Sequence, residues 1–362
     1  MKKKGLVLKR LILIILLIGI FIFFISSRDK AKFEIKVWNN IYNENNIGMY
    51  YGESENPKVK ALNDVYRIKE LVETENEEMD KVLKVVDIVN RIIEFDDVPN
   101  SKKINAFDIL EEKAGLKKVS QRDMAIITRD LLLIINVKAR VGEFKKINNR
   151  KDTVSNYYIV EYWSEEYSKW IMIDFRDRGY IEKEGVPSSA IEIMTELDKS
   201  SIYVGKKESA EYIKDIKGVL DTYMVSIDNS MNMEKSNSYI YYVKDRKYIN
   251  IKLDDNYLPP TVFTENKELF NRNPIDNEIG IDENAYIILM KKETTEVESE
   301  EYIIGAFKDG KIMDKYFIRD NDKVFREVKK YSEIKLVNGN NKIELSIDGE
   351  NTISFIELEY NK

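Results

Sequence analysis

The side chains that most often carry acyl-transfer chemistry are absent from this chain of 362 residues, which contains no cysteine and no histidine. The sequence therefore offers neither a thiolate nucleophile nor an imidazole that exchanges protons near neutral pH. Carboxylates remain, and Asp123, Glu161 and Asp174 are the candidates for an acid and base pair in a hydrolase. We expect them on three separate elements, and nothing in their spacing shows that they converge.

Carboxylate-rich turns are the second group of candidate sites. Residues 254–256, 320–322 and 348–350 contain oxygen ligands of the kind that calcium prefers. Solvated loops carry such residues routinely, so we predict no metal site and no cofactor. The absence of cysteine also excludes a disulfide framework, so each domain must be stable through burial alone.

The middle of the chain changes from a helical to an extended pattern. Apolar spacing predicts helices near residues 79–93, 106–112 and 120–135, the last of them capped by the Ser120 hydroxyl. Strands follow, predicted by β-branched and aromatic residues, over 139–144, 157–163 and 170–175. Because helices precede strands, we predict an α+β domain over residues 75–221.

The last part of the chain, residues 222–362, reads as a series of short strands. Segments 239–243, 248–253 and 286–290 alternate, and Asp-Gly pairs at 309–310 and 348–349 predict two hairpins. We therefore predict a separate C-terminal β-sandwich over residues 222–362.

The first 30 residues have the pattern of a membrane anchor. An apolar run over residues 11–25 follows a cluster of lysine and arginine, which predicts a transmembrane helix with a cytoplasmic N-terminus and the bulk of the chain outside the cell. A cleaved signal peptide is the alternative. A lipoprotein is excluded because lipidation would need a cysteine. Residues 31–74 are expected to be a lead-in or stalk.

Four motifs occur in order within the predicted α+β domain. They are Gln-Arg-Asp-Met-Ala at 121–125, Asn-Val-Lys-Ala-Arg at 136–140, Tyr-Tyr-Ile-Val-Glu-Tyr-Trp at 157–163 and Trp-Ile-Met-Ile-Asp at 170–174. In order and separation they resemble the transglutaminase-like superfamily, whose fold is a variant of the papain-like one. That family has Cys-Arg-Asp-Tyr-Ala, Gly-Ile-Pro-Ala-Arg, His-Ala-Trp-Val-Glu-Val-Tyr and Trp-Val-x-Leu-Asp at these places. The resemblance covers roughly residues 75–200.

The resemblance places the family's catalytic triad on Gln121, Tyr157 and Asp174. Only the aspartate is retained: an amide replaces the nucleophile, and a phenol that titrates near pH 10 replaces the base. The resemblance therefore implies a pseudoenzyme. Two interpretations of the three residues stay open, a satisfied polar cluster that only holds the fold together and a retained binding cleft.

Residues near these positions are the candidates for ligand binding. We select Tyr158, Tyr162 and Trp163, because exposed aromatic rings on a strand can stack on sugars or bind a peptide, and we add Arg140 beside them. Alternation along the strand offers the other interpretation, in which these side chains are ordinary core and surface. Residues 336–345 and 356–358 are similar to the last strands of carbohydrate-binding β-sandwich modules, a pattern shared by immunoglobulin-like sandwiches.

From these features we expect a membrane-anchored, extracellular and non-catalytic transglutaminase-like protein. It would act as a binding or scaffold module at the cell envelope, with a glycan or a protein as partner. Two alternatives stay open, a hydrolase of envelope polymers that uses carboxylates and an accessory subunit of an envelope assembly complex. A net charge of -6 gives no sign of a nucleic-acid partner.

Overall fold

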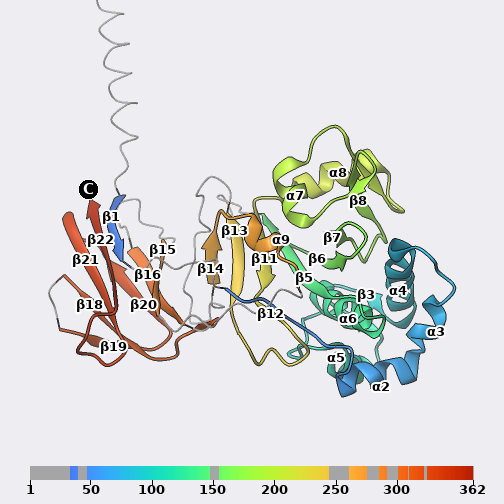
Figure 1. Ribbon diagram of the computed structural model, residues 1–362, viewed down its shortest axis with the longest axis horizontal. Coiled ribbons are helices and arrows are strands. Elements are labelled where there is room, and N and C mark those ends of the chain that lie inside the picture. Colours follow the sequence, from blue (N-terminus) through green and yellow to red (C-terminus); the bar gives the residue numbers. More distant parts are fainter. Residues whose placement is uncertain are drawn as a thin grey trace, which may run out of the picture.

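The computed structural model describes residues 33–39, 47–146, 155–243, 261–274, 285–291, 301–308, 310–321 and 324–361. Within these ranges the chain forms eight helices and several β-sheets. A six-stranded sheet lies in the middle of the molecule, with helices α2 to α6 at one end and the C-terminal strands at the other (Figure 1). The candidate site belongs to the middle sheet and its helices.

The central sheet is mainly antiparallel. In spatial order its strands are β14 (Thr261–Thr264), β13 (Tyr239–Val243), β11 (Thr222–Ser226), β5 (Ala139–Lys146), β6 (Ser155–Ser164) and β7 (Lys169–Ile173). Only β13 and β14 run parallel to each other. Alternation along β6 turns Val160 toward one hydrophobic cluster and Ile159 toward another, so the sheet is buried on both faces.

Helices from the first part of the chain cover one face of this sheet. They are α2 (Pro57–Tyr66), α3 (Ile68–Val72), α4 (Glu78–Ile92), α5 (Ala106–Lys113) and α6 (Gln121–Ile134). Helix α6 is buried from Asp123 onward and packs against Val160 and Tyr162 of β6. The Ser120 hydroxyl accepts a hydrogen bond from the Asp123 backbone at 3.2 Å, which confirms the predicted cap. Short parallel bridges join β3 (Glu94–Phe95) to β4 (Lys118–Val119) just before α6.

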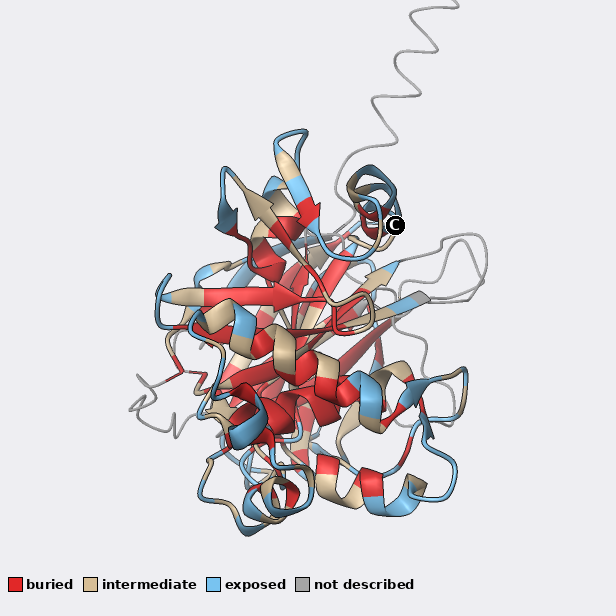
Figure 2. Cartoon of the chain, turned by 90° about the vertical axis from the view of Figure 1, so that its right-hand side faces the viewer, coloured by how far each residue is buried: buried red, intermediate tan, exposed pale blue. Residues whose placement is uncertain are grey.

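Helices from later in the chain cover the other face. They are α7 (Ala190–Glu196), α8 (Ser209–Lys217) and α9 (Glu268–Asn271), and a small sheet of β10 (Ser201–Val204), β8 (Tyr180–Lys183) and β9 (Val186–Pro187) lies beside them. Figure 2 shows the result, buried strands between helices whose outer turns are exposed. A separate two-stranded parallel sheet pairs β2 (Tyr50–Tyr51) with β12 (Asp228–Asn229).

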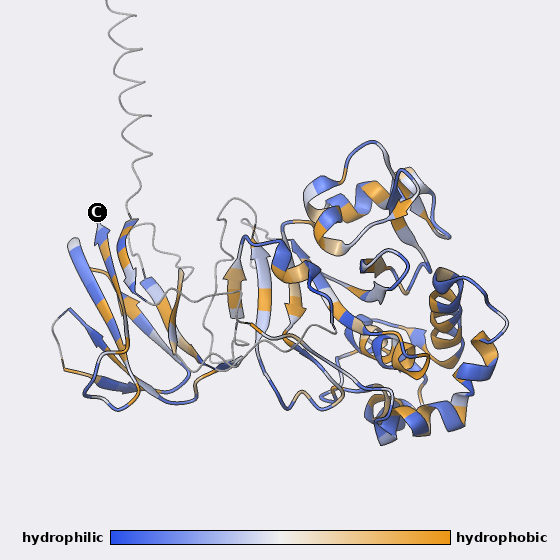
Figure 3. Ribbon diagram, in the orientation of Figure 1, coloured by the Kyte–Doolittle hydropathy of each residue, from blue (hydrophilic) through white to orange (hydrophobic). Residues whose placement is uncertain are grey.

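The C-terminal strands form two further sheets that share one hydrophobic cluster. The first has the order β1 (Phe33–Asn39), β22 (Ser354–Tyr360), β21 (Gly339–Ser346), β18 (Tyr316–Asp320) and β19 (Arg326–Val328). The second contains β15 (Tyr286–Lys291), β16 (Glu301–Lys308), β17 (Lys311–Ile312) and β20 (Tyr331–Lys335). Hydrophobic and hydrophilic residues alternate along β22, as Figure 3 shows. The predicted turn at 348–349 joins β21 to β22, and Gly349 has the positive φ of 83° that the turn needs.

The predicted fold class, α+β with a separate C-terminal β-sandwich over residues 222–362, is wrong. The described chain is mixed α/β, because α7, α8 and α9 return after the first strands and cover the second face of the sheet. Strands β11, β13 and β14, within residues 222–264, extend the central sheet, since β11 pairs with β5.

Two predictions concern residues that the structure does not describe. The predicted membrane span over residues 11–25 and the predicted strand over residues 248–253 both lie outside the described ranges. Among the helices that are described, none combines the length and the apolar character needed to cross a bilayer. Of the predicted lead-in, residues 33–39 pair with the C-terminal strand β22, and α2 and α3 contribute to the core beside α6.

Candidate functional site

Two of the three positions implied by the resemblance meet in a hydrogen-bonded cluster. The Tyr157 hydroxyl donates to Oδ2 of Asp174, and the Tyr212 hydroxyl of α8 donates to the same oxygen at 2.9 Å. The other carboxylate oxygen accepts the backbone N–H groups of Arg176 and Asp177 at 3.0 and 3.3 Å. Asp174 is buried, and both of its oxygens are occupied.

Aromatic and cationic groups close this cluster. The Arg176 guanidinium lies 4.5 Å from the centre of the Tyr157 ring, and Tyr203 stacks on Tyr212 with ring centres 3.5 Å apart. Burial, together with the negative charge of Asp174, raises the pKa of Tyr157 above its ordinary range. Tyr157 is therefore a neutral hydrogen-bond donor at physiological pH and does not supply a general base.

Gln121 stands apart from this cluster. It is the first residue of α6, and its side-chain amide donates to the backbone carbonyl of Tyr158 at 3.2 Å. Successive residues of β6 point to opposite faces of the sheet, so Tyr157 packs against the cluster that includes Tyr212, whereas Tyr158 packs beside α6. Tyr157 is therefore hydrogen-bonded to Asp174, whereas Gln121 is hydrogen-bonded to the backbone of Tyr158 and to neither of these two residues in the described structure.

Most of the predicted binding residues are in the interior. Arg140, Tyr162 and Trp163 are 0%, 1% and 6% exposed, so their side chains are not available to a ligand at the surface. The Arg140 guanidinium pairs with Glu161 at 2.6 Å and lies 4.1 Å from the centre of the Trp170 ring. Tyr158 is half-buried and lines a hollow.

The three carboxylates proposed as acid and base have separate partners. Asp123 accepts from the Ser101 backbone at 2.8 Å and pairs with Arg122 at 3.1 Å. Glu161 is committed to Arg140, to Tyr223 and to the Ala190 backbone. Neither of these carboxylates is hydrogen-bonded to Asp174, so the arrangement does not form an acid and base pair.

The carboxylate-rich turns do not form a metal centre in the described part of the chain. No group of three or more acidic side chains with ligand geometry occurs there. Asp348 instead organises its hairpin, because one of its oxygens accepts the backbone N–H groups of Glu350 and Asn351, both at 2.8 Å. These bonds hold the pKa of Asp348 below its ordinary range. Residues 254–256 and Asp322 lie outside the described residues.

A hollow of about 280 Å³, which the sequence did not reveal, opens beside the first turns of α6. We call it the Glu143 hollow. Glu143 of β5 lies opposite Tyr158 of β6 on one side and Met224 of β11 on the other, so the three side chains form a row across the sheet. The complete lining is Asn100, Ile104, Arg122, Ile126, Arg129, Val141, Glu143, Lys145, Asn156, Tyr158, Met224, Ser226, Asp228, Asn229, Met233 and Tyr239.

Glu143 is the unusual member of this row. It is 1% exposed, and within the described residues its Oε1 atom has no hydrogen-bond partner. Lys145 lies 3.5 Å from its Oε2 atom and donates to the Tyr241 hydroxyl at 2.6 Å. Burial raises the pKa of Glu143 above its ordinary value, and the charge of Lys145 partly opposes this shift.

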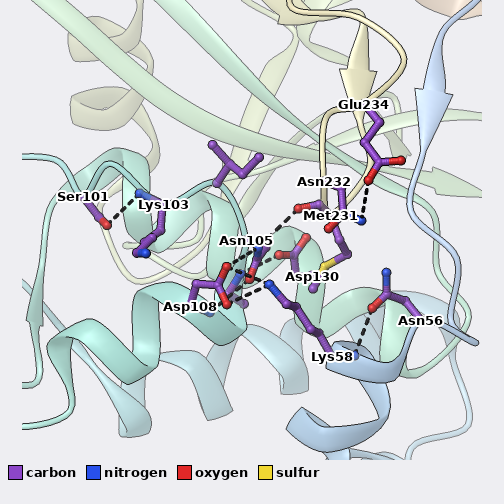
Figure 4. Close-up of polar contacts among 12 residues, drawn as sticks. Asn56, Lys58, Ser101, Lys103, Asn105, Asp108, Asp130, Met231, Asn232 and Glu234 are labelled. Carbon is purple, nitrogen blue, oxygen red and sulfur yellow. Dashed lines mark hydrogen bonds and ion pairs between the residues drawn. The ribbon is translucent and has the colours of Figure 1, made fainter.

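Polar contacts join the start of α5, Asp130 of α6 and the loop after β12 (Figure 4). Arg129 donates to its neighbour Asp130 at 2.7 Å and to the carbonyl of Ile104 at 3.1 Å. Asp130 also accepts the first N–H of α5, and Asn105 reaches the Met231 carbonyl at 3.3 Å. The wall that carries Arg129 is therefore fixed before any ligand arrives.

A signal for this hollow exists in the sequence of β5. Residues 139, 141, 143 and 145 share one face of the strand, and that face begins with Ala139 and Val141 in the core beside α6. A glutamate that continues an inward-facing apolar series is the kind of buried polar group that needs an explanation.

Comparisons with known proteins add little to this description. No protein-family model matches the sequence. No curated protein matches it either. Among solved structures, a "putative cysteine protease" from Cytophaga hutchinsonii aligns with 32% of this chain at 22% identity and a TM-score of 0.25, and the chain spans 37% of that protein's length. A similarity of this extent determines neither the fold nor the activity of the present chain, which has no cysteine.

Proposed function

We propose that this protein is a non-catalytic binding module derived from a transglutaminase-like enzyme. The observation that carries the proposal is the Tyr157–Asp174 hydrogen bond, which occupies the carboxylate that the resembling family uses to orient an imidazole. With Tyr212 on the same oxygen and two backbone N–H groups on the other, Asp174 has no free position for a substrate or a water. The cluster contributes stability and rigidity to the fold.

The first residue of helix α6 also supports the proposal. In the resembling family this helix begins with the nucleophile, whereas here it begins with the Gln121 amide, which is bonded to the backbone of a strand. An amide has no nucleophilic lone pair at neutral pH, so the first step of acyl transfer has no agent at this position.

A hydrolase that uses carboxylates is less well supported. Retaining and inverting hydrolases both place two carboxylates across one scissile bond. Asp123 and Glu161 each pair with an arginine. They lie on opposite sides of the sheet: Asp123 belongs to α6 on one face, whereas Glu161 accepts a hydrogen bond from Ala190 of α7 on the other. The two carboxylates therefore do not face one common position where a scissile bond could lie.

We propose as the partner a glycan or a protein of the cell envelope. Residence at the envelope stays a prediction from the first 30 residues, which lie outside the described ranges. The role of an accessory subunit is a form of the same proposal in which the partner is another protein.

Activity assays on the purified full chain test the absence of catalysis. Amine incorporation into a glutamine peptide, and release of soluble fragments from cell-wall material, should both stay at the level of a blank without protein. Turnover that is lost in Asp174→Asn and kept in Asp198→Asn would contradict the proposal. Asp198 is a suitable control aspartate, because it lies on the surface and pairs with Lys183 and with its own turn.

A further inference from the structure

We propose that the Glu143 hollow binds a neutral sugar ring, taken from a free sugar or from a carbohydrate polymer. This inference rests on the proposed function, because it names the class of ligand that the binding module would take. The hollow is adjacent to Gln121, the position of the nucleophile in the resembling family. Arg122, the next residue, lines the hollow, and the Gln121 amide is hydrogen-bonded to the backbone of Tyr158, which also lines it.

The unpartnered oxygen of Glu143 requires a donor. Buried side-chain oxygens in folded proteins are almost always hydrogen-bonded, and leaving one without a partner is costly. Glu143 Oε1 has none among the described residues, although the side chain is almost completely buried and lines the hollow. A hydroxyl group placed in the hollow would supply the missing hydrogen bond.

The charges around the hollow favour a neutral donor over an ammonium group. Arg122, Arg129 and Lys145 all line it, and Lys145 already lies 3.5 Å from the carboxylate. A cationic ligand would meet these three cations at close range. The two arginines are partly neutralised by Asp123 and Asp130, outside the lining.

An anionic ligand is disfavoured for the opposite reason. It would have to approach Glu143, and the lining also includes the carboxylate of Asp228. A hydroxyl group avoids both conflicts, because it donates to a carboxylate and accepts from a guanidinium at the same time. Several hydroxyl groups on one small ring would use Glu143 and Arg122 together.

The remaining lining has the shape and chemistry for the flat side of a sugar. The rings of Tyr158 and Tyr239 and the apolar side chains of Val141 and Met224 offer surface to C–H groups. Sites for small molecules typically measure about 300 to 1,000 Å³. At about 280 Å³ the hollow is at the lower limit, so it accommodates a single ring and not a long oligosaccharide.

Calorimetric titration of the full chain with matched sugars tests the ligand class. N-acetylglucosamine, glucose and galactose are the neutral probes, glucosamine is the cationic probe and glucuronate the anionic one. At least one neutral sugar should bind about tenfold more tightly than its charged counterpart. Sedimentation of the chain with an insoluble neutral polysaccharide, in competition with the free sugar, separates a polymer end from a free sugar as the source. Binding to no neutral sugar, or tighter binding of a charged one, would overturn the inference.

Two variants connect the binding to this hollow. Glu143→Gln keeps the shape but weakens the hydrogen bond to a hydroxyl, and affinity should fall about tenfold. Met224→Trp fills the hollow and should abolish binding without changing Glu143. The control Glu184→Gln makes the same chemical change at an exposed residue of a different hollow, of about 180 Å³, and should bind normally.

The outcomes distinguish this inference from the proposed function. Sugar binding that is equal in the parent chain and in both variants would place the ligand elsewhere and overturn the inference, while the binding module would stand. Turnover of a substrate would instead contradict the proposed function, whatever the sugar titrations show. Thermal melting of each variant checks that the compared proteins are folded.

Discussion

Tyr157 of β6 donates its hydroxyl hydrogen to Asp174, the residue that directly follows the adjacent strand β7. The sequence resemblance predicts a base and its orienting carboxylate at these two positions. Here the phenol is half-buried, its ring lies under Arg176, and Tyr212 shares the carboxylate oxygen. The pair is part of the protein's internal hydrogen bonding, and this has consequences that can be measured.

Replacing Tyr157 by phenylalanine tests the structural value of this bond. Tyr157→Phe removes one donor from a buried carboxylate but leaves Tyr212 and two backbone donors, so the free energy of unfolding should fall by about 1 kcal/mol. Urea denaturation measures this loss. Tyr167→Phe is the control, since Tyr167 is 36% exposed, and its effect should stay within about 0.5 kcal/mol. Equal effects of the two substitutions would show that the bond contributes nothing.

The ion pair of Arg140 and Glu161 should be far more sensitive, because both side chains are fully buried. Arg140→Ala leaves Glu161 charged without its partner and should cost about 3 to 5 kcal/mol in the free energy of unfolding. Lys183→Ala is the control at a surface pair with Asp198, where about 1 kcal/mol or less is expected.

A double variant identifies the origin of that cost. Arg140→Met with Glu161→Gln removes both charges. The amide oxygen can still accept from the Ala190 backbone, and the amide NH₂ group can donate to the Tyr223 hydroxyl. It should be more stable than Arg140→Ala in the same urea denaturation. A double variant as unstable as the single one would mean that lost packing on Trp170, and not an unpaired charge, dominates.

Glu143 should make stability depend on pH. Burial raises its pKa in the folded chain above the value of 4.5 that it has when unfolded, so between these two values the folded state binds more protons. The free energy of unfolding should therefore fall as pH rises through this window, and the loss is complete above the folded-state pKa. Glu143→Gln removes the titration, so at neutral pH it should be more stable than the parent.

Urea denaturation at intervals from pH 4 to pH 8 checks the pH dependence. The difference between Glu143→Gln and the parent should be small near pH 4 and should grow as pH rises. The exposed Glu184→Gln should follow the parent curve at every pH. A difference between Glu143→Gln and the parent that stays constant with pH would contradict the raised pKa.

Local features of the chain could be predicted because their causes are local. The start of α6 follows from the Ser120 cap, and β5, β6 and β7 follow from β-branched and aromatic runs between polar turns. The turn before β22 follows from Asp-Gly. Each of these depends on residues within a few positions of one another.

Strand partners could not be predicted, because pairing joins segments that are remote in the sequence. β11 pairs with β5 across about 80 residues and β1 with β22 across more than 300, and neither pairing has a signature in the strands themselves. The missed pairing of β11 with β5 also hid the Glu143 hollow, because Met224 completes the row beside Glu143. The same strand pairing explains why Tyr158 lies beside the hollow. Tyr162 and Trp163, on the same strand, are buried in the interior instead.

Introducing a cysteine at position 121 and a histidine at position 157 should not create acyl-transfer activity. In Gln121→Cys with Tyr157→His, the new imidazole would take the place of a ring that packs beside Tyr212, whereas the thiol would replace an amide that reaches Tyr158. A thiolate needs its base within hydrogen-bond distance, and Gln121 and Tyr157 share no contact of this kind in the described structure. The double variant should therefore incorporate no amine into a glutamine peptide above the rate of the parent chain. Titration of the new thiol with a fluorogenic alkylating reagent gives a second readout, and its reactivity should show no added step near the pKa of histidine. Measurable transfer, or a thiol activated by the imidazole, would show that the two positions still approach each other.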